Sequence, residues 1–232
     1  MLYPPPVSDS AESTRTRPFD RLRVLAVQEV EVAPNLRHVE TYTLDGLLTL
    51  LWHGPPAAAE VVLMCGGAMG GLLGPARGLY HDLGCAFAER GIGTIRVGYR
   101  RPNHLESCVL DVAAAADIAN RSGAKRFVVM GHSFGGAVAV NAGAALRRVT
   151  RGVVTLSTQS AGCETAAALG GIPLLLLHGD RDELLPVEAS EAVKTLAGGG
   201  ELVVLPGTGH LLLEAGEELR RRLLAWIPER LR

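Results

Sequence analysis

The stretch VVMGHSFGGAV, residues 128–138, decides how the rest of the chain is interpreted. An apolar run ends in it, glycines surround the single Ser133, and small apolar residues follow. The pattern G-x-S-x-G at this point fits a tight turn from a buried strand into a helix. Such a turn can hold an inert serine, but it can also present a reactive one, because strained turns cluster at functional sites.

The motif by itself is weak evidence. A chain with 28 glycines in 232 residues contains one such match by chance in roughly one case in eight. Its context carries more weight, since it follows a predicted strand at 126–131 and precedes a predicted helix at 134–147. Side chains at the two glycine positions would collide with the neighbouring helix and strand. The context therefore favours a catalytic role for Ser133.

The composition is that of an ordinary globular chain. Hydrophobic residues make up 47% of it and the net charge is −1, which disfavours a nucleic-acid-binding protein. No apolar run reaches the ~18 residues needed to span a bilayer, and no signal peptide is visible. We therefore expect a cytoplasmic protein with a small-molecule substrate, no nucleic-acid partner and no membrane span. The sequence does not indicate an oligomeric state.

The four cysteines are widely separated along the chain. They form no C-x-x-C pair, so the sequence predicts neither a zinc site nor a redox motif, and no metal or cofactor is expected. Reduced and mostly buried thiols are typical of a cytoplasmic protein. These residues are Cys65, Cys85, Cys108 and Cys163.

The order of apolar segments predicts an α/β fold. Residues 1–20 are rich in Pro, Ser, Thr and charge, and we expect a flexible leader there. Residues 21–232 should form a single domain that begins with a hairpin signalled by Asp45-Gly46. Apolar strands then alternate with amphipathic helices, and the late strands are continuous apolar runs typical of a parallel sheet covered on both faces. The expected sheet has about eight strands, is mostly parallel and starts antiparallel. The later strands are expected at 60–65, 92–99, 126–131, 152–157, 172–179 and 201–206.

A serine hydroxyl needs a general base to become a good nucleophile. An acid and then a histidine should follow it along the chain, each at the carboxyl end of a later strand. The stretch LLLLHGDRDELLP supplies Asp180, Asp182 and Glu183. The stretch LVVLPGTGHLLLE supplies His210 after the last strand. The expected order of residues is therefore present.

From about residue 40 onward, the chain resembles the α/β-hydrolase-fold serine hydrolases. In that family an H-G-x-x-D stretch supplies the acid, and here it ends at Asp182, with Asp180 as the competitor and His178 as a turn residue. The resemblance implies that Ser133 attacks a carbonyl, that His210 moves the proton and that Asp182 orients His210.

The resemblance also implies two backbone donors for the oxyanion. One is the N–H of Phe134, directly after the serine, and the other comes from the loop CGGAMGG. Relatives often begin this loop with His-Gly, whereas here it begins Cys65-Gly66. Gly67 matches the donor position best, and its neighbour Ala68 is the alternative.

Only residues 158–171 lie where many relatives carry a cap, so we expect a fairly open site without a lid. Ala68, Met69, Leu184 and Leu211 are its expected substrate-pocket residues, and Leu72, Leu73, Phe134 and Leu185 are further expected wall residues. Arg100 and Arg101 could contact an anionic substrate group, although solvated loop arginines are the commoner case. The sequence suggests no role for His132 beyond lining the turn.

These features predict a hydrolase that cleaves an ester or thioester of a small to medium acyl group through an acyl-enzyme. The same triad could instead serve perhydrolysis, acyl transfer or C–C bond hydrolysis. A dienelactone-type enzyme would favour cysteine where this chain has Ser133. A non-catalytic binding module on the same fold is the alternative of another class.

Overall fold

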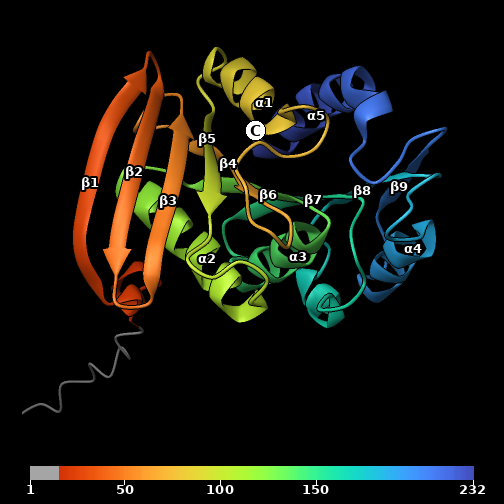
Figure 1. Cartoon of the computed structure of the whole chain (residues 1–232), viewed down its shortest axis with the longest axis horizontal. Helices are drawn as coiled ribbons and strands as arrows, with labels where there is room; N and C mark the ends of the chain where they lie inside the picture. The colour runs from red at the N-terminus through yellow and green to blue at the C-terminus, as the bar shows by residue number, and fades with distance from the viewer. Residues whose placement is uncertain (1–15) are drawn as a thin grey trace, which may run out of the picture.

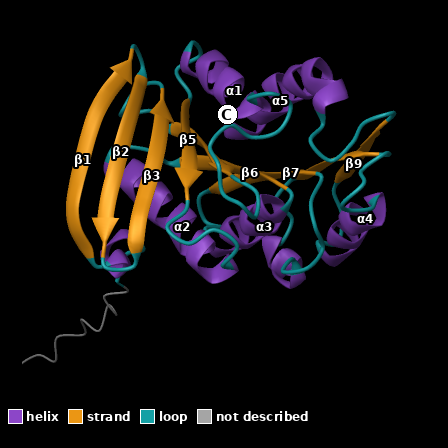
Figure 2. Ribbon diagram, viewed as in Figure 1, coloured by secondary structure: helices purple, strands orange, loops and turns teal. Residues whose placement is uncertain are grey.

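The strands and helices expected from the sequence assemble into one twisted sheet with helices on both faces (Figures 1 and 2). The computed structural model describes residues 16–232, and within them the sheet has nine strands, against about eight expected. The strand order is β1-β2-β3-β5-β4-β6-β7-β8-β9. The strands are β1 (Val24–Ala33), β2 (Leu36–Thr43), β3 (Gly46–His53), β4 (Glu60–Cys65), β5 (Gly93–Gly98), β6 (Arg126–His132), β7 (Thr150–Leu156), β8 (Leu174–Gly179) and β9 (Glu201–Leu205).

The first three strands form an antiparallel meander, and its β2–β3 hairpin turns at Asp45-Gly46, where the sequence predicted a hairpin. Thr43 pairs with Gly46 at the turn between β2 and β3, where Gly46 has a φ of 128°, a conformation that glycine adopts readily. Strand β3 then pairs antiparallel with β5, which joins the meander to the rest of the sheet. Strand β1 is left as an exposed edge along its whole length.

The six strands from β4 to β9 run parallel. Every residue of β8 is buried, as expected for a strand covered on both faces. Helices α1 and α5 cover one face, and α2, α3 and α4 cover the other (Figure 2). The helices are α1 (Leu79–Ala88), α2 (Leu105–Arg121), α3 (Phe134–Ala145), α4 (Val187–Leu196) and α5 (Gly216–Leu231), with short 3-10 helices η1 (Phe19–Leu22), η2 (Glu164–Leu169) and η3 (Leu213–Ala215).

Each face of the sheet has its own hydrophobic core, because successive side chains of a strand point to opposite faces. In β4, Met64 joins the core under α1 and α5, together with Leu83 of α1. Its neighbour Leu63 joins the core under α2 and α3, together with Val112 and Val138. The central strands are thereby held between two apolar layers.

Residues 1–15 of the expected leader lie outside the described residues. The leader was expected to extend to residue 20, but residues 17–20 are attached to the domain. Arg17 forms an ion pair of 2.6 Å with Asp117 of α2, and the guanidinium of Arg121 lies 5.4 Å from the centre of the Phe19 ring. These residues are attached because the Arg17 cation and the Phe19 ring both contact side chains of α2.

Three of the four cysteines are buried, and Cys85 on α1 is exposed. Between β7 and β8, residues 157–173 contain the short η2 and no longer helix. In the part of the chain that the structure describes, no helix has both the length and the apolar character to cross a membrane.

A buried ion pair joins the loop after β5 to α2. Asp111 accepts hydrogen bonds from the backbone N–H of Arg100 at 2.9 Å and from its Nε at 2.5 Å. The carboxylate is fully buried and the Arg100 side chain is 5% exposed. Burial raises the pKa of Asp111, while its bonds with Arg100 act in the opposite direction. Arg100 is therefore committed to Asp111 and is not free to meet a substrate.

Replacing Asp111 with alanine should lower the free energy of unfolding by about 3–5 kcal/mol, because the buried Arg100 guanidinium loses its buried partner and keeps only the partly exposed Asp45, 3.8 Å away. Glu218→Ala is the matched control, since Glu218 pairs with Arg221 and Arg222 at the surface and should lose at most about 1 kcal/mol. Urea unfolding at equal m-values measures both. Equal losses in the two variants would contradict this view of the pair.

Candidate active site

Ser133 occupies the turn between β6 and α3 in a backbone conformation that few residues adopt. Its φ is 56° and its ψ is −122°. A Cβ on Gly131 would lie 1.9 Å from the carbonyl oxygen of Gly135, and one on Gly135 would lie 2.4 Å from that of Gly66. Any other residue at either position would collide with neighbouring backbone. The two glycines of G-x-S-x-G are therefore required because the chain segments approach each other so closely here.

Asp182 and His210 come into direct contact from the loops after β8 and β9. His210 Nδ1 lies 2.8 Å from Asp182 Oδ2 and 3.0 Å from Oδ1. Asp182 Oδ1 also accepts the N–H groups of Leu184 and Leu185 at 2.9 and 2.8 Å. Burial alone would raise the pKa of Asp182, but the bonds from Leu185, His210 and Leu184 hold it below its usual value. The carboxylate is thus kept ionised beside the imidazole.

Asp180, the other acid of this loop, contacts the backbone that leads to His210. Its Oδ1 accepts the N–H of Gly207 at 2.6 Å and that of Thr208 at 3.4 Å. Glu183 accepts the backbone N–H of His210 at 3.2 Å. Of the three acids that the sequence offered, Asp182 is the one whose carboxylate bonds the His210 ring, and the other two brace its loop.

His178, expected as a turn residue, is fully buried beneath Asp182. Its Nε2 lies 3.0 Å from the carbonyl oxygen of Leu185 and 3.2 Å from Asp182 Oδ2. Its Nδ1 lies 2.7 Å from Ser190 Oγ. Because a carbonyl only accepts, Nε2 carries a hydrogen and donates it to Leu185. His178 therefore supports the loop that carries Asp182.

His132, for which the sequence suggested no role beyond lining the turn, ties the Ser133 turn to the His210 loop. Its Nε2 donates to the backbone carbonyl of His210 at 2.9 Å, and the two ring centres are 4.8 Å apart. Burial lowers the pKa of His132 to about 4, so the ring is neutral at physiological pH. The position before Ser133 was visible in the sequence, but its partner could be found only in three dimensions.

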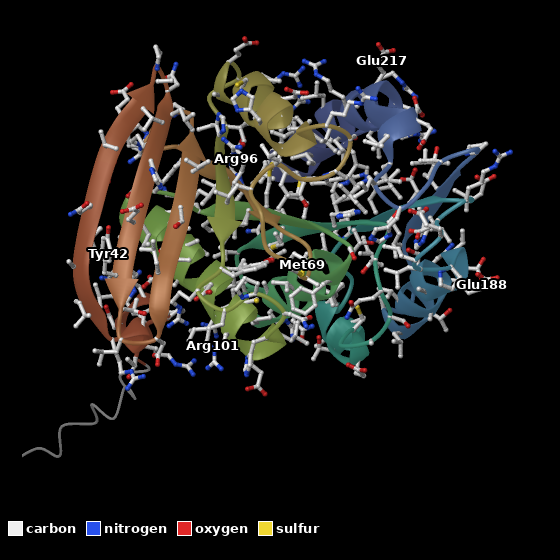
Figure 3. All side chains as sticks on the ribbon, viewed as in Figure 1. Tyr42, Met69, Arg96, Arg101, Glu188 and Glu217 are labelled. Atoms are coloured by element: carbon white, nitrogen blue, oxygen red, sulfur yellow. The ribbon has the colours of Figure 1, made fainter. Side chains whose placement is uncertain are left out.

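Ser133 and His210 line the same cavity of about 420 Å³. The structure forms no hydrogen bond between these two side chains among the described residues. Apart from His132, the remaining wall consists of glycines and apolar side chains, and Met69 at the rim is 94% exposed (Figure 3). The expected pocket residues Ala68, Met69, Leu72, Leu73, Leu184 and Leu211 all line it.

Other expected contacts with the cavity are not found. Phe134, the first residue of α3, is buried in the core under α2 and α3, and neither it nor Leu185 lines the cavity. Arg101 is exposed and does not line the cavity. A larger hollow of about 670 Å³ lies between α1 and α5 and contains none of the predicted site residues.

The loop after β4 is held against the Ser133 turn. Tyr80 donates to the carbonyl of Cys65 at 2.9 Å, and Tyr99 donates to that of Gly66 at 3.2 Å. A Cβ on Gly67 would lie 3.9 Å from the carbonyl oxygen of His132, so Gly67 lies directly beside the residue that precedes Ser133. A backbone donor from this loop can therefore reach the cavity near the serine.

Solved structures with the same fold are found at low sequence identity. Est1E from Butyrivibrio proteoclasticus is 20% identical, with a TM-score of 0.67 over 83% of this chain and 98% of that chain. Dienelactone hydrolase from Anabaena variabilis is 18% identical, with a TM-score of 0.72 over 89% and 99%. A thioesterase domain from the curacin biosynthetic pathway is 14% identical, with a TM-score of 0.62 over 87% and 100%. No curated protein sequence matches the chain significantly.

The family comparison agrees with this fold. The model described as "Alpha/beta hydrolase family" matches residues 79–215, which is more than half of the chain. That range begins with α1 and includes the Ser133 turn, the Asp182 loop and His210. The chain therefore belongs to the alpha/beta hydrolase family.

Proposed function

We propose that the protein is a serine hydrolase that cleaves a carboxylic ester or thioester of a small to medium acyl group. The observation that carries the proposal is the contact of Asp182 with His210 Nδ1 beside a cavity that holds Ser133 on its strained turn. An imidazole oriented in this way has Nε2 free to accept a proton. The names of the similar structures, which include a thioesterase domain and a dienelactone hydrolase, agree with acyl chemistry.

In the proposed reaction, Ser133 Oγ bonds to the substrate carbonyl carbon and its proton passes to His210 Nε2. The tetrahedral intermediate then collapses, and the departing alcohol or thiol takes that proton from His210. Water attacks the acyl-enzyme next, with His210 again as the base, and releases the acid and the free serine. Asp182 stays ionised throughout and stabilises the His210 cation.

The oxyanion that forms in both steps needs preformed donors. The Phe134 N–H at the start of α3 is the first donor in this proposal, where the positive end of the helix dipole adds to its effect. Gly67 supplies the second, supported by its place beside the carbonyl of His132, and Ala68 remains the alternative. Loss of one such donor typically raises the barrier by ~3 kcal/mol.

The cavity supports a substrate of modest size. Its volume of about 420 Å³ and its apolar, exposed rim suit a small to medium acyl chain rather than a long one held under a lid. A cytoplasmic location and a small-molecule substrate are part of the same proposal. Perhydrolysis, acyl transfer and C–C bond hydrolysis would use the same three side chains with a different entering or leaving group.

Replacing Ser133 with alanine should lower kcat on nitrophenyl esters by on the order of 10⁴-fold or more, because no nucleophile remains. Ser122→Ala is the control, since Ser122 lies exposed at the end of α2. A fluorophosphonate should label Ser133 in the wild type and the control, but not in Ser133→Ala. Activity that survives the Ser133 substitution would refute the mechanism. A wild-type protein that is not labelled by the fluorophosphonate would favour a non-catalytic binding module.

Replacing Asp182 with asparagine should lower kcat by about 10⁴-fold, since the amide favours the wrong tautomer of His210. Asp180→Asn is the matched control in the same loop and should have a much smaller effect, because Asp180 bonds backbone N–H groups and not the imidazole. Steady-state kinetics on one ester measures both variants. The reverse order of losses would assign the role to Asp180.

A series of nitrophenyl esters of rising acyl length should give kcat/KM values that rise through short chains and then fall. The physical reason is that apolar area is gained until the chain outgrows the cavity. Matched thioesters measured on the same enzyme separate the two substrate classes. A steady rise to the longest acyl chain would refute the proposed size limit.

A further inference from the structure

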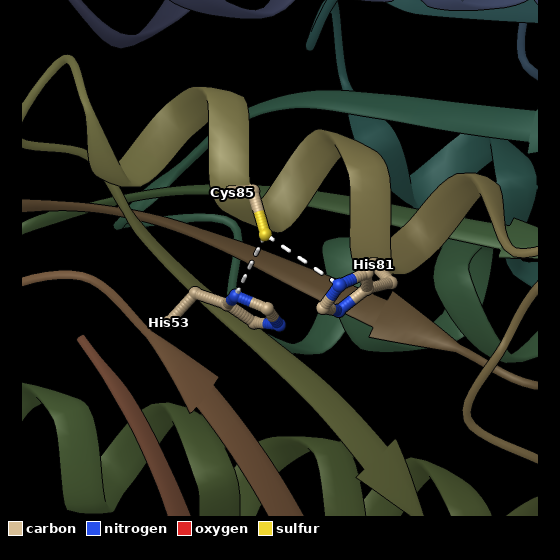
Figure 4. A group of neighbouring side chains, drawn as sticks. All are labelled: His53, His81 and Cys85. Atoms are coloured by element: carbon tan, nitrogen blue, oxygen red, sulfur yellow. Dashed lines mark hydrogen bonds between the residues drawn. The ribbon is translucent and has the colours of Figure 1, made fainter. Parts of the chain in front are cut away.

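Three side chains that bind transition metals meet away from the Ser133 cavity, where β3 ends beneath α1 (Figure 4). His53 is the last residue of β3, and His81 and Cys85 lie on α1. The Cys85 sulfur is 3.7 Å from His81 Nε2 and 4.0 Å from His53 Nδ1. None of the three lines the cavity that contains Ser133.

The local structure brings these side chains together for simple reasons. His81 and Cys85 are four residues apart on a helix, so they lie on one face one turn apart. Gly84 lies between them, and a Cβ there would be 2.7 Å from His53 Cδ2. The missing side chain at Gly84 is what lets the His53 ring approach the helix.

The spacing of the three donor atoms is close to that of a tetrahedral zinc site. Zn–S bonds of about 2.3 Å and Zn–N bonds of about 2.0–2.1 Å at tetrahedral angles place sulfur and nitrogen about 3.6 Å apart. The three donors all lie within 4.8 Å of one another, and His81 and Cys85 are exposed.

His53 is the buried member of the group and has no other polar side-chain partner among residues 16–232. It is 2% exposed, and its Nε2 has no hydrogen-bond partner. Its Nδ1 faces the Cys85 sulfur, which is a weak hydrogen-bonding atom. Burial, with a contribution from Arg96, lowers the pKa of His53 to about 4, so the ring is neutral and its lone pair is available.

We propose that His53, His81 and Cys85 bind one Zn²⁺ ion, with water in the fourth position. Cys85 loses its proton on binding, so that a thiolate and two neutral imidazoles hold the metal. Soft thiolate and imidazole ligands favour zinc over magnesium or calcium. The ion would link the antiparallel part of the sheet to α1, and the inference does not depend on the proposed hydrolase chemistry.

The positive charge of the buried Arg96 guanidinium disfavours cation binding at this site. It interacts with both His53 and Cys85. A bound dication would be repelled by it, and the negative charge of the Cys85 thiolate is what offsets that repulsion. Binding should therefore depend most strongly on Cys85.

The test uses the full chain, freed of metal by a chelator and kept reduced, and titrated with Zn²⁺ against a chromophoric competitor. The wild type should bind about one ion per chain. Cys85→Ser and His81→Gln should each weaken binding by more than the roughly 10- to 100-fold that loss of an outer-shell partner costs. Both residues are exposed, so neither change threatens the fold.

His38→Gln is the control, because His38 is a partly exposed histidine on β2 outside the group. It should bind like the wild type. Co²⁺ should give the wild type, but not Cys85→Ser, a thiolate-to-metal charge-transfer band. Zn²⁺ should also slow alkylation of Cys85, read by mass spectrometry. Equal Zn²⁺ affinity in the wild type and Cys85→Ser, or a cobalt spectrum without the thiolate band, would overturn the proposal.

Discussion

The close approach of backbone to backbone around Ser133 is the constraint on which the rest of the site depends. Gly131 and Gly135 allow α3 to pack directly on the end of β6, and Gly135 also rests against the carbonyls of Cys65 and Gly66. Three chain segments thus meet with no side chain between them. The positive φ of Ser133 follows from this contact, because the chain must turn from strand to helix within one residue.

The sheet brings the other components to the same place. Parallel strands end at one edge, so the loops after β4, β6, β8 and β9 converge there. The loops are then fixed by bonds from side chains to the backbone, such as those from Asp180 to Gly207 and from His132 to His210. The Asp182 carboxylate thus contacts the imidazole of His210, and the backbone of His210 is bonded by His132 at its carbonyl and by Glu183 at its N–H. Most of the polar side chains near the site therefore serve to hold the loops in place.

The order of strands and helices was predictable from the sequence, because continuous apolar runs and helical spacing report burial directly. Contacts that depend on side-chain direction were not. Phe134 was expected in the pocket wall, but as the first residue of α3 it points into the core. Arg100 was expected to be a possible substrate contact, but it pairs with Asp111 on the following helix, α2. The partner of His132 lies 78 residues further along the chain, where no spacing rule reaches.

The same limit applies to the metal-binding group. Rules for zinc sites search for cysteines close together in sequence, and this chain has no such pair. A helix can instead offer a histidine and a cysteine four residues apart, and a strand end can supply the third ligand from 28 residues before His81. Only the fold shows that Gly84 leaves room for the His53 ring. A glycine in a helix, where it costs about 1 kcal/mol relative to alanine, is thus a useful sign that another residue needs the space.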